Sequence, residues 1–170
     1  MSLEELERRI KVLEDVEEIK KLKAYYCAYV DAGFDADALA GLFTEDAVWD
    51  ADTRGRGEGR EEIRGLFQRG PQRLPFAVHM VMNPIIEVNG DTAKGTWYLL
   101  EPCTFADGNR AVWGAARYDE DYVRVDGQWK FQNLKLTSRF WTPFDEGWVK
   151  TRFISASTPR RNYEPGGAGE

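Results

Sequence analysis

The chain has 170 residues, of which 13% are aromatic, and its formal net charge is −6 at pH 7. This length suits one domain with a sizeable core, whereas the acidic balance argues against a surface that binds nucleic acid. The sequence has no apolar run approaching the roughly 20 residues that cross a bilayer, and its charged N-terminus lacks the apolar core of a signal peptide, so we expect a cytoplasmic protein with no membrane partner.

A long amphipathic helix is predicted at the N-terminus, running towards Val30 and ending near Gly33. Its first turns, residues 1–15, are expected to project from the domain as a helical arm. A monomer that exposes such an apolar face is disfavoured, and we therefore expect a homo-oligomer, either a dimer or a trimer. The apolar positions with helical spacing are Leu3, Leu6, Ile10, Leu13, Val16, Ile19 and Leu22.

Two short helices and a strand are predicted next. Asp35 or Asp37 suits the N-cap of the first helix. The stretch "DAVWDAD" is typical of a strand, and "GREEIRGLFQRG" of a second helix that stops at Gly70–Pro71. The stretch "RGRGEGR" has GxGxG spacing rather than the GxGxxG of a dinucleotide-binding loop, so we interpret it as a turn.

From Phe76 onward the pattern changes to strands. Four runs rich in β-branched and aromatic residues are separated by the turn signals Asn89-Gly90, Asp107-Gly108 and Asp126-Gly127. Strands joined in this way form an antiparallel meander. Together with the preceding helices, they predict an α+β fold whose helices cover one face of a curved sheet.

The chain is expected to form a single domain over residues 1–155, because neither an internal repeat nor an interdomain linker is visible. The Pro- and Gly-rich end, residues 156–170, is expected to be a flexible tail. Cys27 and Cys103 are too few for a disulfide framework or a zinc site, and a single histidine leaves a metal site short of nitrogen ligands. Only a carboxylate site stays open, so we expect no metal and no cofactor.

The single histidine, His79, lies in the apolar stretch "FAVHMVMNP", which we expect to be a strand. Such a histidine is either a hydrogen-bonded core residue or a general acid–base group held in a dry pocket. Glu101 raises the same question, because alternation places it on one apolar strand face with Trp97 and Cys103.

Two further polar residues lie in apolar surroundings. Asp31 follows three tyrosines at the end of the long helix, and Arg139 is expected to share a strand face with Thr137 and Trp141. Each is ordinary on its own, as a helix cap or an edge-strand arginine. Together with the histidine and the glutamate, they fit a polar cluster inside an aromatic cavity, the usual form of a small-molecule site.

Four stretches in this order resemble the SnoaL-like group of the nuclear-transport-factor-2-like superfamily: "EEIKKLKAYYCAYVDAG", "GREEI", "VHMVMNPIIEVNGDTAKGTWYLLE" and "YVRVDGQWKFQNLKLTSR". More narrowly the sequence resembles the bile acid 7-alpha-dehydratases, and more distantly scytalone dehydratase. The likeness runs from about Leu3 to Arg139. It implies a cone-shaped, cystatin-like fold, in which a strongly curved mixed sheet wraps around the N-terminal helices, with the pocket in its mouth.

The resemblance also implies roles for individual residues. The family's histidine–aspartate dyad falls on His79 and Asp31, and its helical tyrosine falls on Tyr26. The bile acid enzymes have an aspartate where this chain has Glu101, and the final-strand arginine falls on Arg139. These last two are expected to bind substrate, as are Trp97 and Trp141.

The implied activity is a cofactor-independent dehydration of a bulky hydrophobic ring compound, such as a hydroxysteroid or an aromatic substrate. The same groups suit a carbon–carbon lyase that releases formaldehyde from lignin-derived diaryl compounds, and the aromatic stretch "FWTPFDEGW" favours that alternative. A non-catalytic module that binds small molecules is the third possibility, because fold alone does not fix function.

Overall fold

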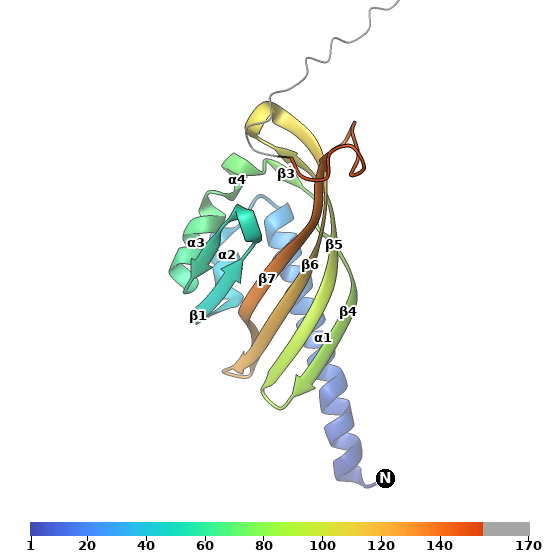
Figure 1. The fold of residues 1–170 in the computed structure, drawn as a ribbon. Helices are drawn as coiled ribbons and strands as arrows, with labels where there is room; N and C mark the ends of the chain where they lie inside the picture. The colour runs from blue at the N-terminus through green and yellow to red at the C-terminus, as the bar shows by residue number, and fades with distance from the viewer. Residues whose placement is uncertain (155–170) are drawn as a thin grey trace, which may run out of the picture.

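The computed structural model describes residues 1–154, so the predicted tail 156–170 lies outside the described residues. Helices α1 to α4 lie on one face of a strongly curved sheet (Figure 1). The elements are α1 (Leu3–Asp31), α2 (Ala36–Gly41), β1 (Phe43–Asp50), the 3-10 helix η1 (Asp52–Arg54), β2 (Arg56–Glu58), α3 (Arg60–Gln68), α4 (Gly70–Arg73), β3 (Phe76–Ala77), β4 (Met80–Asn89), β5 (Thr92–Phe105), the 3-10 helix η2 (Asp107–Asn109), β6 (Arg110–Val125) and β7 (Gln128–Pro143).

The sheet has seven strands in the order β2-β1-β7-β6-β5-β3, with β4 also paired to β5. Strand β1 runs parallel to β7, and the other pairs are antiparallel, so the sheet is mixed. Strands β4 to β7 form the predicted antiparallel meander. The predicted α+β architecture, a curved mixed sheet with the N-terminal helices against one face, is confirmed.

Two of the predicted turns are tight hairpins. Asp126 and Gly127 both have positive φ, 49° and 78°, as a type I′ turn requires. The loop after Asn89 places Gly90 at its first position with φ 61°, the position that a type II′ turn gives to glycine. The third turn, at Asp107-Gly108, is longer and contains η2.

Two local predictions need correction, and a third needs an addition. The stretch "RGRGEGR" is not only a turn, because Arg56–Glu58 pair with β1 as strand β2. Helix α3 ends at Gln68, just before the predicted stop at Gly70–Pro71, but a further short helix that was not predicted, α4, begins at Gly70. The stretch around His79 is not one strand, since the sheet pairing stops after Ala77 and resumes at Met80.

The core is built where the inner side of α1 meets the concave face of the sheet. Tyr26 packs edge-on against Phe43, Phe67, Tyr118 and Phe131, with ring centroids 5.8 to 6.4 Å apart. Aromatic rings prefer such edge-to-face contacts to face-to-face stacking. Much of the high aromatic content is therefore used to fill the interior of the cone.

A buried ion pair lies within this aromatic core. The Lys23 side chain is 0% exposed, and its Nζ lies 2.5 Å from Oε1 of Glu120, 97 residues later in the chain. The Tyr122 hydroxyl donates to the other oxygen of Glu120. The ammonium also lies 3.2 Å from the centre of the Tyr118 ring, a cation–π contact.

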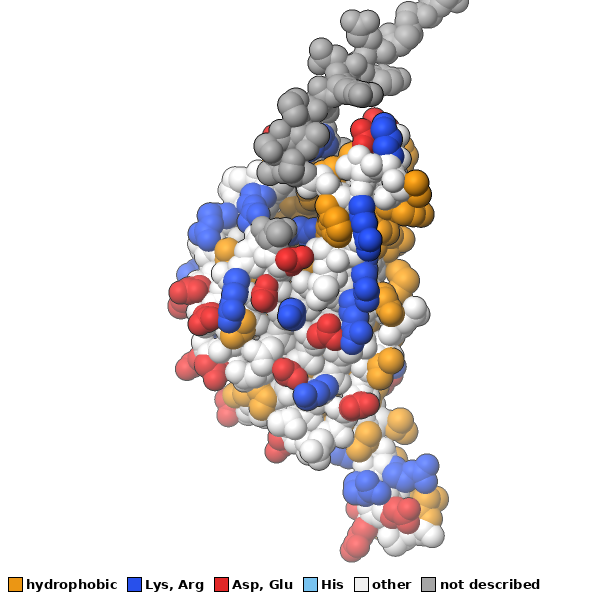
Figure 2. All heavy atoms as spheres, in the orientation of Figure 1, with side chains coloured by type: hydrophobic (Ala, Val, Ile, Leu, Met, Phe, Trp, Pro, Cys, Tyr) orange, Lys and Arg blue, Asp and Glu red, His pale blue; other side chains and the backbone are white. Residues whose placement is uncertain are grey.

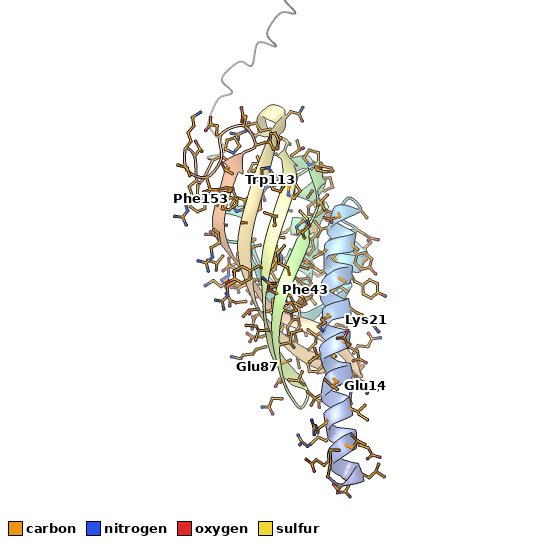
Figure 3. The ribbon with its side chains drawn as sticks, turned by 90° about the vertical axis from the view of Figure 1, so that its right-hand side faces the viewer. Glu14, Lys21, Phe43, Glu87, Trp113 and Phe153 are labelled. Atoms are coloured by element: carbon orange, nitrogen blue, oxygen red, sulfur yellow. The ribbon has the colours of Figure 1, made fainter. Side chains whose placement is uncertain are left out.

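The first turns of α1 extend past the end of the sheet, as Figure 3 shows for the turns before Glu14. Asp15 marks where the helix meets the sheet, since it is buried and its Oδ1 lies 2.5 Å from Nη2 of Arg124. Upstream of it, the apolar residues are exposed, with Leu3 at 70% and Leu13 at 67%. Among the described residues, no helix is long and apolar enough to cross a membrane.

We propose that this exposed arm packs against a second copy of the chain in a homo-oligomer, because apolar surface of this kind gains stability when it leaves water. Light scattering at micromolar concentration is expected to give a dimer or a trimer. Leu6→Lys together with Leu13→Lys should shift the protein to a monomer, whereas Glu7→Lys should not. A stable wild-type monomer would contradict the proposal.

Candidate active site

A cavity of about 810 Å³ lies between the sheet and the helices. Its walls come from α1, β1, η1, α3, α4, β5, η2, β6 and β7, and residues 153–154 also contribute. This volume lies in the range that holds drug-sized ligands. Acidic and basic side chains are interspersed over the outer face of the sheet, whereas hydrophobic ones gather at the end that carries β3 and the last described residues (Figure 2).

Asp31 and His79 are brought together from positions 48 residues apart. Asp31 is the last residue of α1, and its Oδ1 lies 2.7 Å from Nδ1 of His79. The backbone N–H of His79 donates to the same carboxylate, at 3.0 Å to Oδ2. Because one carboxylate holds both the backbone and the ring, the imidazole has a fixed position, and its Nε2 is left for chemistry.

The break between β3 and β4 is what allows this contact. Val78 still donates its backbone N–H to the Pro102 carbonyl of β5, at 3.1 Å, but the N–H of His79 turns to Asp31 instead of to β5. The His79 side chain is only 7% exposed and lines the cavity. The local irregularity therefore aims the ring inward, as bulges and strand breaks near active sites commonly do.

Glu101 faces the free nitrogen of this imidazole. The Glu101 side chain is 3% exposed, and its Oε2 lies 3.6 Å from Nε2 of His79. This separation exceeds that of a hydrogen bond, so the two groups flank one part of the cavity without being joined. Burial and the neighbouring Glu101 carboxylate raise the pKa of the Cys103 thiol, which keeps that thiol protonated and unsuited to act as a nucleophile.

Tyr26 presents a phenol to the same cavity. Its oxygen accepts a hydrogen bond of 3.1 Å from Nε1 of Trp49, and its own O–H has no acceptor among residues 1–154. Burial raises the pKa of Tyr26 well above its usual value. The phenol is therefore a proton-bearing donor that can stabilise negative charge on a bound molecule.

The structure does not bring Arg139 to the cavity. An irregularity in the pairing of β6 with β7 matches Ala116 to Ser138 and Ala115 to Phe140, which leaves Arg139 without a partner between them. Such a bulge shifts the alternation of side chains by one residue. Ser138 and Trp141 consequently line the cavity, while Arg139 is exposed, and the expectation that it binds substrate is corrected.

The two tryptophans predicted to bind substrate have different positions. Trp141 is buried and lines the cavity. Trp97 is buried deeper in the core, where its Nε1 donates to the Tyr122 hydroxyl at 3.0 Å, and it does not line the cavity. Alternation along β5 correctly places Trp97 and Glu101 on one face, but the cavity occupies only the part of that face near Glu101.

Two residues that line the cavity were not predicted from the sequence. Arg54, in the segment interpreted as a turn, lines the cavity with its guanidinium carbon 3.1 Å from the centre of the Trp141 ring. Trp49, in the predicted strand, positions the hydroxyl of Tyr26. Neither carries a sequence signal, because an arginine in a glycine-rich loop and a tryptophan in a strand are most often surface and core residues.

The end of the described chain closes one side of the cavity. Trp141 accepts and donates backbone hydrogen bonds with residues 152–154, at 2.8 and 2.9 Å, so this segment folds back beside β7. Phe153 and Ile154 thereby join the cavity wall. No cluster of histidine, cysteine, aspartate and glutamate in residues 1–154 is placed to hold a metal ion.

Comparison with known proteins identifies the domain family and several similar proteins. The SnoaL-like domain family matches residues 11–135. The chain is similar to gamma-hexachlorocyclohexane dehydrochlorinase of Sphingobium indicum, with 27% identity over 107 residues, which are 62% of this chain and 69% of the relative. The crystal structure of a type 2 hexachlorocyclohexane dehydrochlorinase superposes with a TM-score of 0.75 and 26% identity, covering 80% of this chain and 93% of the other.

Two further solved structures, both from Novosphingobium aromaticivorans, support the fold alone. A scytalone dehydratase-like protein has a TM-score of 0.71 and 22% identity, covering 78% of this chain and 89% of the other. A nuclear-transport-factor-2-like protein with a cystatin-like fold has a TM-score of 0.63 and 24% identity, covering 88% and 94%. The cystatin-like fold is thus confirmed, while the narrower resemblance to bile acid 7-alpha-dehydratases stays a prediction.

Proposed function

The chain belongs to the SnoaL-like domain family, and from this premise we propose that it is a cofactor-independent lyase that carries out acid–base elimination on a bulky hydrophobic ring substrate. The observation that carries the proposal is the dyad: Nδ1 of His79 is held 2.7 Å from Asp31, while Nε2 is directed towards the cavity that Glu101 and Tyr26 also line. The similarity to a dehydrochlorinase supports elimination as the reaction class.

The mechanism begins with the imidazole of His79. With its Nδ1 hydrogen donated to Asp31, Nε2 has a free electron pair and takes a proton from the carbon next to the one that bears the leaving group. The electron pair of that C–H bond forms the new double bond, and the bond to the leaving group breaks. The Asp31 carboxylate stabilises the resulting imidazolium.

A hydroxyl leaving group has to be protonated as it departs. The imidazolium of His79 returns its proton to that oxygen when the proton and the hydroxyl lie on the same side of the substrate, so that water is released. Tyr26 donates a hydrogen bond to a substrate oxygen on which negative charge develops. The narrower proposal is accordingly a dehydratase acting in the cytoplasm on a hydroxysteroid or an aromatic alcohol.

A carbon–carbon lyase is the second candidate, favoured by the aromatic wall. Trp141 and Phe105 stack with ring centroids 6.0 Å apart, and Phe153 lies beside them in the lining. These rings suit a diaryl compound. In that reaction His79 removes the hydroxyl proton of a primary alcohol, the adjacent carbon–carbon bond breaks, and formaldehyde leaves. The imidazolium then returns the proton to the carbon that keeps the electron pair of the broken bond.

Mass spectrometry of incubations with hydroxysteroids and lignin-derived diaryl alcohols tests both candidates. We expect a product that has lost water, formed by the wild type and not by His79→Asn. A product that has lost formaldehyde would contradict dehydration and support the carbon–carbon lyase reaction. Ligands that raise the melting temperature and are never converted would contradict both and leave a binding module.

A further inference from the structure

Trp141 forms a flat, fixed wall of the cavity. Its ring lies directly over Gly114 of β6, where a Cβ atom would come within 2.2 Å of the ring. The indole Nε1 donates to the hydroxyl of Ser138 at 3.1 Å, and the Phe105 ring stacks alongside. The glycine therefore leaves space that the indole fills, and the ring has little freedom to move.

Arg54 is held against this wall. Its backbone is fixed on both sides, because its N–H donates to the Ala51 carbonyl at 3.0 Å and its carbonyl accepts from Arg73 at 2.8 Å. The guanidinium carbon lies 3.1 Å from the centre of the Trp141 ring, a stacked arrangement that arginine favours. Stacking uses the face of the guanidinium and leaves the N–H groups at its edge available.

Those N–H groups have no partner in the part of the chain that the structure describes. Within residues 1–154, the Arg54 side chain makes no ion pair and no hydrogen bond, although other arginines of the chain do. Glu101 is the carboxylate that favours its charge most, but it does not reach an ion pair with Arg54. Burial lowers the pKa of Arg54, yet a guanidinium stays protonated in proteins.

Arg54 is partly buried, and a charge that is partly removed from water and has no partner within residues 1–154 is unfavourable. A ligand that brings an anionic group to Arg54 offsets this unfavourable energy. The planar fork of N–H donors matches the two oxygens of a carboxylate. The surrounding Trp141 and Phe105 rings supply an apolar seat for the ring system that carries the anion.

We propose that Arg54 determines substrate specificity by binding an anionic oxygen substituent, a carboxylate or a phenolate, on the ring compound that fills the cavity. That this compound is the substrate rests on the proposed lyase function. The substrate class thereby narrows from any bulky hydrophobic ring compound to ring compounds with an acidic oxygen group. Arg54 here takes the role that the sequence analysis assigned to Arg139.

Calorimetry with a matched pair of probes tests this assignment without requiring turnover. 2-Naphthoate and 2-naphthamide have nearly the same shape and differ in charge. The wild type is expected to bind 2-naphthoate at least about tenfold more tightly, as charge-assisted hydrogen bonds imply. Arg54→Gln should bind the two probes equally, while Arg139→Gln should retain the wild-type preference.

The proposal is overturned if the wild type shows no preference for 2-naphthoate or if Arg54→Gln keeps it. If Arg54→Gln fails to fold, Arg54→Lys serves instead, because it keeps the charge, loses the fork and should reduce the preference for 2-naphthoate. A wild type that prefers 2-naphthoate but converts no substrate would contradict the lyase proposal and leave Arg54 as an anion anchor.

Discussion

His79→Asn is expected to fold as the wild type does and to lose at least about a hundredfold in turnover, the lower end for loss of a general acid–base group. The asparagine amide can accept or donate a hydrogen bond, so it can satisfy a merely structural role beside Asp31. It cannot carry a proton between substrate atoms. Steady-state kinetics, with circular dichroism to confirm folding, separates the two roles.

Asp31→Asn tests the other half of the dyad. Its carboxylate accepts from both Nδ1 and the backbone N–H of His79, at 2.7 and 3.0 Å. An amide leaves one of these donors facing another donor and favours the tautomer in which Nε2 carries the hydrogen. We expect a similar loss, of at least about a hundredfold, and a double variant scarcely worse than either single one, because residues that act as a unit are not additive.

The matched control is Asp119→Asn. This carboxylate also has a cationic partner, Arg117 at 2.6 Å, but it lies outside the cavity. Its turnover should stay within about twofold of the wild type, as expected for an exposed ion pair of small energetic weight. If His79→Asn retained wild-type turnover, the histidine would be structural, and the dyad assignment would be wrong.

Lys23→Met is expected to lower the free energy of unfolding by about 3–5 kcal/mol, the usual effect of breaking a buried ion pair. The methionine leaves Glu120 as a charge in the core, with only the Tyr122 hydroxyl to stabilise it. The cation–π contact with Tyr118 is lost as well. In a domain of this size each kcal/mol shifts the melting temperature by about 2–4 °C, so the loss is readily measured.

Lys20 provides the control on the same helix. Its Nζ lies 2.6 Å from Glu17, but both side chains are exposed, so Lys20→Met should cost less than about 1 kcal/mol. Lys23→Met combined with Glu120→Leu should recover much of the lost stability, because no unpaired charge remains. Equal melting temperatures for Lys23→Met and the wild type would show that the pair contributes nothing to the fold.

The elements that local sequence rules determine were predictable. Each of these features depends on a few neighbouring residues. They are the helical spacing of α1, its end at Gly33 with positive φ, the Asp35 cap of α2 and the turn at Asp126-Gly127. The pairing of His79 with Asp31 is different, because it joins residues 48 apart. Only the family resemblance could place the two together.

The errors concern features that depend on distant partners. Arg139 lies outside the cavity because of a bulge in the pairing of β7 with β6. Arg54 stacks on the ring of Trp141, which in turn occupies the space that Gly114 leaves on β6. In the sequence, Lys23 has the pattern of an exposed helix residue. It is buried in the structure because the sheet places Glu120 against it. The alternation of side chains along a strand and the periodicity of a helix each describe one element at a time. They therefore cannot predict contacts between elements.

The central claim is that His79 removes a proton from carbon. It is tested most directly with the substrate found by mass spectrometry, deuterated at the carbon next to the leaving group and assayed in ordinary water. Elimination through His79 predicts slower turnover of the deuterated substrate and loss of the deuterium to solvent. If the deuterium is retained in the products and turnover is unchanged, the carbon–hydrogen bond is not broken, and elimination is contradicted.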